Sequence, residues 1–451
     1  MVEDIEKLTE KAERPGRLAP HLHRYYGGKI QTIPKCSIRG LQDFDIWYTP
    51  GVAAVSKLIM EDEDRSFEYT NRGNTVAIVS DGTRVLGLGN IGPAAGLPVM
   101  EGKALLFKYL GGVDAIPLSV DIQDPYELIQ FLKYIEPSFG GINLEDIEKP
   151  KCFYILEEAR KRLSIPVWHD DQQGTATVIL AGLINALKLV GKKLSEVKIV
   201  LYGVGAANTK GAEVLMLAGA NPKNMYLIDS KGVIHADRRD ILVDEKNPWK
   251  YRLAEKTNPD MIEKIEDAFQ GADVVIGASR PGPGVIKKEW IRRMSDKAIV
   301  FATANPIPEI WPWEAKEAGA LIVATGRSDF PNQINNSLGF PGIFRGVLDV
   351  RAKTITDMMC VVAAEAIAEY AEERGLREDY IVPSMEDWEV YPKVAVAVAL
   401  ESIKEGLARR KISRDELWER AVTQIRNSRE ALHTLVKSGL IKEIPEIEDI
   451  K

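Results

Sequence analysis

Acidic side chains stand in adjacent pairs directly after short apolar segments in the first half of the chain. Each apolar segment has the length and composition of a buried strand, and a helix-like pattern follows it. If these strands are parallel, their carboxyl ends meet at one edge of a sheet, and the carboxylates converge there. Oxygen ligands without a His or Cys cluster favour Mg²⁺ or Mn²⁺. The pairs are Glu145 and Asp146 after residues 141–144, and Asp170 and Asp171 after residues 165–168.

Helix capping is the other role open to each acid, because Asp is a frequent N-cap residue. Capping alone accounts for Asp121 or Asp124, which follow the strand-like segment 115–120. Two acidic pairs at two strand ends exceed what capping needs, so the spacing favours a metal site.

The elements around these acids alternate regularly between strand-like and helix-like patterns. Residues 113–190 read as three strand–helix units, which predicts parallel strands with right-handed crossovers. Before them, the Asp81-Gly82 dipeptide between strand-like segments 75–80 and 84–88 predicts a hairpin. A second alternating region begins at Val197 and continues through strands near 273–277, 298–303 and 321–324, whose ends carry Ser279 and Asn305.

We therefore predict an α/β protein with an N-terminal α/β substrate domain and a Rossmann-type doubly wound parallel sheet that binds a dinucleotide. After residue 350 the pattern is helical, with apolar stripes suited to packing on the other domains or on a subunit partner. The predicted limits are 1–170 for the substrate and metal domain, 171–375 for the nucleotide domain and 376–451 for the helical segment.

A glycine-rich turn follows strand 198–202 and opens a helix that runs to about Leu217. This order matches a dinucleotide fingerprint, in which a tight turn lets the backbone approach a pyrophosphate at the helix N-terminus. Asp229 ends the next strand, where an acid can bind the ribose. The predicted cofactor residues of the turn are Gly203, Gly205, Ala206, Ala207 and Asn208, the last in place of the third glycine.

Another glycine pattern, Gly87-Leu-Gly89-Asn-Ile-Gly92, fits the fingerprint letter for letter. Pro93, Gly96 and Pro98 follow where a helix should begin, so we interpret this stretch as a loop outside the cofactor site. The Gly-rich, Pro-interrupted surroundings also suggest that Lys103 and Arg84 lie on ordered loops lining a cleft.

The composition is that of an ordinary globular protein, with 451 residues, 45% hydrophobic residues and a net charge of −7. Interspersed charges give no broad basic face for nucleic acid, and no apolar run suggests a membrane span. Three scattered cysteines are typical of intracellular thiols. We expect a cytoplasmic protein with neither nucleic acid nor membrane as a partner.

A nucleotide domain beside a carboxylate-bound metal suggests oxidation of a small hydroxy-substrate by a nicotinamide cofactor. Such a reaction needs a base for the hydroxyl proton and a cation for a substrate carboxylate. Lys103 and Arg84 are the candidates. A base must be partly neutral, and a nearby metal cation in a dry cleft would lower the Lys103 pKa as required.

The chain resembles the malic enzymes, specifically the small type of bacteria and archaea. The resemblance spans about residues 40–346 and rests on TPGVA, SDGTRVLGLGNIG, GLPVMEGKALLFK, INLEDI, PVWHDDQQGTA, GVGAAN, ATANPIPE and NNSLGFPG in this order. It implies oxidation of malate by NAD⁺ or NADP⁺, loss of CO₂ and protonation of enolpyruvate to pyruvate. It also implies a homodimer or higher assembly.

The resemblance further implies a role for each matched residue. Lys103 is the general base, Tyr48 the acid that protonates the product carbon, and Asp170 a carboxylate that orients one of them. Gln173 stands where many small malic enzymes have His, so no role of that His is carried over. The metal ligands would be Glu145, Asp146 and Asp171, and the substrate or nicotinamide contacts Arg84, Asn305, Asn335 and Asn336.

The choice of cofactor and two alternative functions stay open. Asp229 favours NAD⁺, whereas Ser230, Lys231, Arg238 and Arg239 would suit NADP⁺, so the choice is undecided. An amino-acid dehydrogenase, which needs no divalent metal, is the alternative enzyme. A nucleotide-binding protein without catalysis is the other alternative, because fold alone does not determine function.

Overall fold

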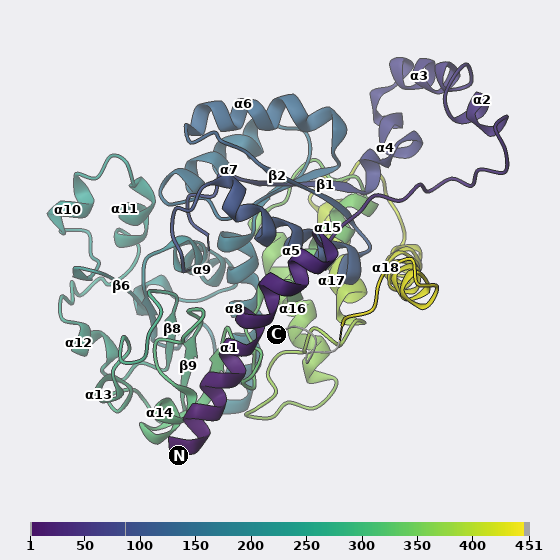
Figure 1. The fold of residues 1–451 in the computed structure, drawn as a ribbon. Coiled ribbons are helices and arrows are strands. Elements are labelled where there is room, and N and C mark those ends of the chain that lie inside the picture. Colours follow the sequence, from purple (N-terminus) through teal and green to yellow (C-terminus); the bar gives the residue numbers. More distant parts are fainter. Residues whose placement is uncertain (1, 86, 446–451) are drawn as a thin grey trace.

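Short apolar segments form two separate sheets in the computed structural model, which describes residues 2–85 and 87–445 (Figure 1). The first sheet has four parallel strands in the order β2-β1-β3-β4. The second has six strands in the order β10-β9-β8-β5-β6-β7, parallel throughout except that β7 runs antiparallel to β6. The predicted α/β class with a doubly wound parallel sheet is confirmed. The strands are β1 Thr75–Ser80, β2 Asp114–Ser119, β3 Gly141–Leu144, β4 Val167–His169, β5 Ile199–Tyr202, β6 Met225–Asp229, β7 Gly232–Val233, β8 Val274–Gly277, β9 Ala298–Ala302 and β10 Ala320–Thr325.

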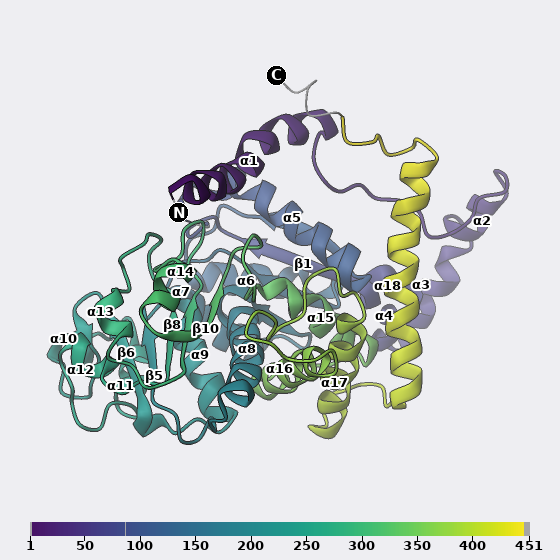
Figure 2. The same ribbon diagram turned by 90° about the horizontal axis from the view of Figure 1, so that it is seen from below.

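Helices cover these sheets and fill the space between them. Figure 2 shows α18 standing upright at one side of the molecule. The helices are α1 Val2–Tyr26, α2 Asp43–Trp47, α3 Val52–Glu61, α4 Ser66–Tyr69, α5 Pro93–Gly111, α6 Pro125–Ile135, α7 Lys151–Arg162, α8 Thr175–Val190, α9 Ala206–Leu217, α10 Arg239–Leu242, α11 Pro248–Ala254, α12 Ile265–Phe269, α13 Lys288–Ile291, α14 Pro312–Glu317, α15 Phe340–Asp349, α16 Asp357–Glu372, α17 Val390–Lys404 and α18 Arg414–Lys437.

The predicted hairpin at 75–88 is wrong. β1 is a central strand that pairs in parallel with β2 and β3, and every residue of it is buried. Residues 84–88 form no strand among the described residues, and only an isolated bridge joins Val85 to Gly89. A strand buried on both faces needs parallel neighbours supplied by crossovers, and this requirement overrides the local turn signal.

Lys103 lies on a helix, not on the loop that the sequence suggested. The glycine-rich stretch before it is a loop, as predicted, but α5 begins at once at Pro93 and passes through Pro98. Proline is well tolerated in the first helical turn, where its missing N–H has no partner to lose. The helix therefore presents Lys103 from a rigid element.

The two sheets are joined through α8 and the turn before it. Asp170–Gly174 is a wide helical turn between β4 and α8, and the Thr175 N–H donates back to the Asp170 carbonyl. Such wide turns occur often at functional sites. Among the described residues, Asp170–Val190 is the segment long and apolar enough to cross a membrane, but 78% of its most apolar stretch is buried inside the protein.

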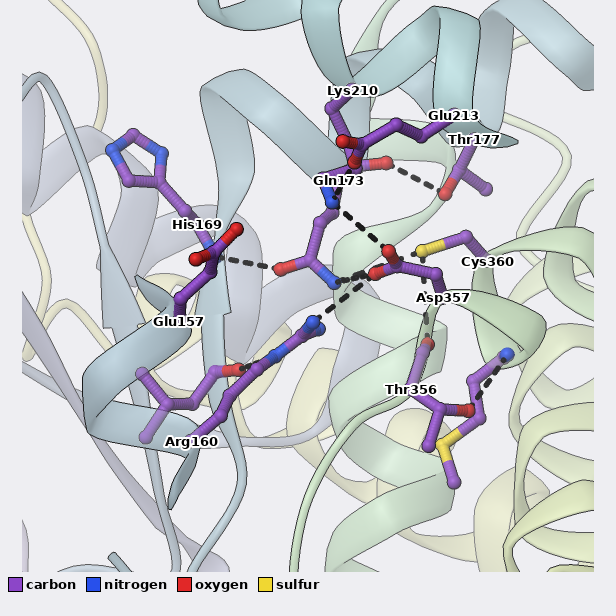
Figure 3. A network of polar contacts seen from close by, with 12 residues as sticks. Glu157, Arg160, His169, Gln173, Thr177, Lys210, Glu213, Thr356, Asp357 and Cys360 are labelled. Atoms are coloured by element: carbon purple, nitrogen blue, oxygen red, sulfur yellow. Dashed lines mark hydrogen bonds and ion pairs between the residues drawn. The ribbon is translucent and has the colours of Figure 1, made fainter. Parts of the chain in front are cut away.

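A partly buried network of charged and polar groups links this turn to three helices (Figure 3). The Asp357 carboxylate, at the start of α16, accepts from Arg160 Nη1 of α7 at 3.1 Å and from Lys210 Nζ of α9 at 2.9 Å. Gln173 Nε2 also donates to Asp357 Oδ1, at 3.4 Å, while Gln173 Oε1 accepts from the His169 backbone N–H at 3.1 Å. Gln173 thus links the end of β4 to α16.

Opposite charges keep the Asp357 carboxylate ionised. Burial alone would raise its pKa, but Lys210 and Arg160 outweigh burial and lower it. Burial would likewise lower the Lys210 pKa, and Asp357 and Glu213 raise it instead. Removing one member of such a group leaves the others short of a partner.

We expect Asp357→Asn to lower the free energy of unfolding by about 2 kcal/mol, since Arg160 and Lys210 lose their shared counter-charge. Gln173→Glu alone should also destabilise, because it sets a second carboxylate against Asp357. The double variant Gln173→Glu/Asp357→Asn restores one carboxylate and one amide and should be more stable than either single variant. Urea unfolding of all four proteins measures this.

Asp379→Asn serves as the matched control, because Asp379 forms an exposed pair with Arg377, and the change should alter stability by less than about 0.5 kcal/mol. If the two single effects simply add in the double variant, the amide and the carboxylate do not interact as described.

Candidate active site

Four carboxylates gather at the adjacent ends of β3 and β4. The strands pair in parallel with Leu144 opposite His169, so Glu145 and Asp170 leave the sheet side by side. Asp146 has a left-handed backbone (φ 54°), and its N–H donates to Asp171 Oδ2 at 2.9 Å. The structure brings together the two acidic pairs that the sequence singled out.

Lys103 reaches this edge from α5. Its Nζ lies 2.6 Å from Asp170 Oδ2 and 3.1 Å from Glu145 Oε1, and 4.4 Å from the centre of the Phe340 ring. The side chain is 9% exposed, so it is held almost entirely inside the protein. An ammonium in this position joins the ends of both strands.

The surroundings of Lys103 favour its charged form. Burial acts to lower its pKa, but Asp170 and Glu145 outweigh burial and raise the pKa above the usual lysine range. The lowered Lys103 pKa that we expected depended on a nearby metal cation. In the chain by itself the charges that contact Lys103 are carboxylates, and they raise its pKa instead.

Three residues that the sequence analysis did not assign support the carboxylates. Trp168 Nε1 donates to Asp170 Oδ1 at 3.0 Å, and Asn143 Nδ2 donates to Glu145 Oε2 at 2.9 Å. A Cβ at Gly174 would lie 2.0 Å from Asp170 Oδ1, so any larger residue would displace the Asp170 carboxylate. Asn143 stands two residues before Glu145, and alternation along a strand places both side chains on the same face. This spacing was the sequence signal that could have identified Asn143.

Negative charge exceeds positive charge in this cluster. Burial raises the Glu145 pKa well above its usual value, Asp171, Asp170 and Asp146 raise it further, and Lys103 opposes them. No group of three His, Cys, Asp or Glu side chains in the described part of the chain is already arranged around a metal position. The donors themselves are hard carboxylate oxygens in charge excess, which fits a divalent cation such as Mg²⁺ or Mn²⁺.

The glycine turn after β5 adopts the geometry of a phosphate-binding loop. Gly203 has φ +99°, and a Cβ there would lie 2.6 Å from the Ala278 carbonyl and 2.8 Å from Ser279 Cβ. Gly205 caps α9, whose first residues are Ala206 and Ala207. The close approach of the β8 loop explains why residue 203 must be glycine.

Asn208 faces the sheet in this arrangement. It is fully buried, and its Nδ2 donates to the carbonyls of Tyr202 at 3.2 Å and Ile276 at 3.1 Å. It therefore ties β5 to β8 at the position where the fingerprint has its third glycine.

Glu309 organises the loops after β8 and β9, and the sequence analysis did not single it out. Its Oε1 accepts from the backbone N–H and the hydroxyl of Ser279, at 2.8 and 3.1 Å, and its Oε2 accepts from the Ala304 N–H at 3.1 Å. Burial raises its pKa, while these donors lower it in part. Its place in the ATANPIPE motif was the available signal.

The remaining predicted contacts differ in their surroundings. Asn336 lies beside the Asp170 turn, since a Cβ at Gly174 would be 3.2 Å from Asn336 Cβ. Asn335 Oδ1 accepts from the Ser337 N–H at 2.9 Å and so serves a turn. Arg84 and Asn305 are exposed, and the Arg84 N–H donates to the Asp146 carbonyl at 3.0 Å.

One chain does not bring Tyr48 to Lys103. Tyr48 follows α2 and is 72% exposed. Helices α2 and α3 form a lobe, residues 43–61, that projects away from α5 in both views (Figures 1 and 2).

Comparison with known proteins matches two malic enzyme domains in order along the chain. The family "Malic enzyme, N-terminal domain" matches residues 27–160, and "Malic enzyme, NAD binding domain" matches residues 172–403. The chain is 47% identical over 403 residues to the bifunctional malic/malolactic enzyme of Bacillus subtilis, covering 89% of this chain and 96% of that one. It is 49% identical over 387 residues to the NAD-dependent malic enzyme of Geobacillus stearothermophilus, covering 86% and 79%.

Solved structures are similar over nearly the whole chain. The malic enzyme of Entamoeba histolytica has a TM-score of 0.95 at 49% identity, covering 98% of this chain and 92% of that one. The malic enzyme of Pyrococcus horikoshii has a TM-score of 0.88 at 52% identity, covering 91% and 95%. With both family domains matched in order and these relatives aligned along most of its length, the chain belongs to the malic enzyme family.

Proposed function

We propose that this enzyme oxidises malate with NAD⁺ or NADP⁺ and releases pyruvate and CO₂, with Mg²⁺ or Mn²⁺ bound at the carboxylate cluster. The observation that carries the proposal is the buried Lys103 ammonium held between Asp170 and Glu145. All three cysteines are free thiols, which is compatible with our prediction of a cytoplasmic enzyme.

Each residue of the site has a defined task in this proposal. In its neutral form, Lys103 accepts the proton of the malate hydroxyl, and Asp170 holds the lysine amine in position through its 2.6 Å contact. Arg84 binds a malate carboxylate, with Asn305, Asn335 and Asn336 as further contacts to substrate or nicotinamide. The buried setting excludes water from the proton transfer.

Glu145, Asp146 and Asp171 would hold the divalent cation. When bound, the cation polarises the substrate oxygen and stabilises the negative charge that develops on decarboxylation. A second positive charge beside Glu145 and Asp170 would also weaken their hold on the Lys103 proton, as a general base requires.

The assay for this function supplies malate with NAD⁺ or NADP⁺, with Mg²⁺, with Mn²⁺ and with EDTA, and follows reduced cofactor and pyruvate together. We expect both products in equal amounts, loss of turnover in EDTA and recovery with added metal. Turnover that persists in EDTA overturns the metal site, and absence of malate turnover in every condition overturns the function.

Lys103→Ala should reduce kcat by at least about 100-fold, because a general base contributes roughly this much or more. Lys108→Ala is the matched control, since Lys108 lies on the same helix in a part-exposed pair with Asp114 and should keep full activity. Near-normal kcat in Lys103→Ala would exclude the lysine as the base.

We also propose that Tyr48 protonates the product carbon in the active site of a second copy of the chain. The support is that the α2–α3 lobe carries Tyr48 away from its own Lys103 and exposes apolar side chains, among them Trp47 at 51% and Met60 at 82%. Exposed apolar surface of this kind is typical of an interface. A two-fold symmetric dimer would exchange the lobes reciprocally.

Mixed dimers distinguish the two arrangements. Tyr48→Phe and Lys103→Ala should each be inactive as homodimers, whereas a mixed dimer of the two carries one site with both intact residues. Co-expressed, separately tagged and purified mixed dimers should therefore regain roughly half of the wild-type pyruvate formation. If Tyr48 acts within its own chain, every site lacks one residue and the mixed dimer stays inactive.

A further inference from the structure

The carboxylate at the end of β6 is fully occupied by the protein itself. Asp229 Oδ1 accepts from the Lys231 backbone N–H at 2.9 Å and from Arg238 Nη1 at 2.9 Å. Its Oδ2 accepts from Arg238 Nη2 at 3.0 Å and from Lys250 Nζ at 2.9 Å. An ionised carboxylate has about four acceptor positions, and these contacts use all of them.

An acid at this place in a Rossmann fold binds the ribose 2′-OH of NAD⁺ when it has acceptor capacity to spare. Asp229 has none in this arrangement. To accept a ribose hydroxyl it would have to exchange a charge-assisted bond with Arg238 or Lys250 for a weaker bond to a neutral donor. The strand end therefore lacks the feature that makes an acid select NAD⁺.

The same strand end carries an excess of cations. Lys231 and Arg238 contact Asp240 at 3.0 and 2.8 Å, and Lys250 pairs with Asp229 as its single acidic partner among the described residues. Lys149, from the loop after β3, donates to the Val204 carbonyl of the glycine turn at 2.8 Å. The region between the glycine turn and the end of β6 thus holds four cationic side chains and the two carboxylates of Asp229 and Asp240.

Lys149 lies within electrostatic range of Lys250 and Asp229. Burial lowers the Lys149 pKa, the positive charge of Lys250 lowers it further, and Asp229 opposes both effects in part. Lys149 has no ion pair within the described part of the chain, so a bound anion would relieve this repulsion. The position between a phosphate-binding turn and the ribose end is where a 2′-phosphate would lie.

We propose that Asp229 is a positioning residue for Arg238 and Lys250, and that this site binds the 2′-phosphorylated cofactor NADP⁺ in preference to NAD⁺. Asp229 keeps the guanidinium and the ammonium on the ribose side, and the surplus positive charge, shared with Lys149, pairs with the phosphate. This inference deepens the proposed function and rests on it for the reaction, but its test is a binding measurement.

Isothermal titration of the full-length protein with NADP⁺ and NAD⁺, and with adenosine 2′,5′-bisphosphate and 5′-AMP, measures the contribution of the 2′-phosphate. We expect NADP⁺ to bind at least tenfold more tightly than NAD⁺, and the bisphosphate to bind at least tenfold more tightly than 5′-AMP. The NADP⁺ advantage should shrink as salt increases, because the contact is ionic. Equal affinities, or tighter binding of NAD⁺, would overturn the inference.

Lys250→Gln should remove most of the NADP⁺ advantage while the affinity for NAD⁺ holds or rises, since part of Asp229 is released. Arg252→Gln is the matched control, because Arg252 lies on the same helix in an exposed pair with Glu157 and should leave both affinities unchanged. Equal weakening of both cofactors by Lys250→Gln would assign Lys250 a structural role and contradict the proposal.

The two proposals fail in different ways. Malate turnover that prefers NAD⁺ overturns the cofactor inference and leaves the proposed reaction standing. Tight, 2′-phosphate-dependent binding without malate turnover supports the cofactor inference and overturns the reaction.

Discussion

Burial of the Lys103 ammonium between the carboxylates that follow β3 and β4 is the interaction on which the candidate active site depends. Removing an isolated ammonium or carboxylate from water costs free energy. Here the opposite charges offset this desolvation cost for one another. The parallel pairing of β3 and β4 sets Glu145 and Asp170 side by side, and α5 delivers the opposing charge. A shift of register at this edge would separate the three groups and leave buried charges without partners.

The same principle holds at two other places in the chain. At the junction of the sheets, one carboxylate, Asp357, serves cations from two helices and the amide of Gln173. At the end of β6, Asp229 serves Arg238 and Lys250. In each case a buried or partly buried acid orients cations that come from other elements. The remaining local charge differs in sign between two of these sites. It is negative around Glu145 and positive around Asp229.

This difference in sign separates the two halves of the proposed reaction. In the proposed function, the carboxylate cluster would attract a divalent cation and, through it, an anionic substrate. The cationic strand end would attract the phosphorylated end of the dinucleotide. The turn Asp170–Gly174 lies between the first sheet and α8, and α8 leads into the second sheet, so the two charged regions are connected by one continuous and largely buried segment.

Local patterns in the sequence were sufficient for the fold class, for the alternating strands and helices of residues 113–229, for the strands near 273–277, 298–303 and 321–324, and for the acidic pairs at the strand ends. These features depend on hydrophobic periodicity and on short spacings, which are properties of neighbouring residues. The family motifs added the identity of the family. The local patterns failed at two places. At residues 84–88 the turn signal predicted a second strand, but β1 pairs with parallel neighbours instead. At Pro93 the prolines suggested a loop, but a helix begins there.

Tertiary structure alone decided which charges meet. Lys103 and Asp170 are 67 residues apart, and Gln173 and Asp357 are 184 apart, so no spacing rule connects them. It also decided that Lys103 is surrounded by acids that raise its pKa, that Asp229 is saturated by Arg238 and Lys250, and that Tyr48 stands away from its own Lys103. The reason is physical: pKa values and hydrogen-bond capacity depend on the groups within a few ångströms, and only the folded chain determines which groups those are.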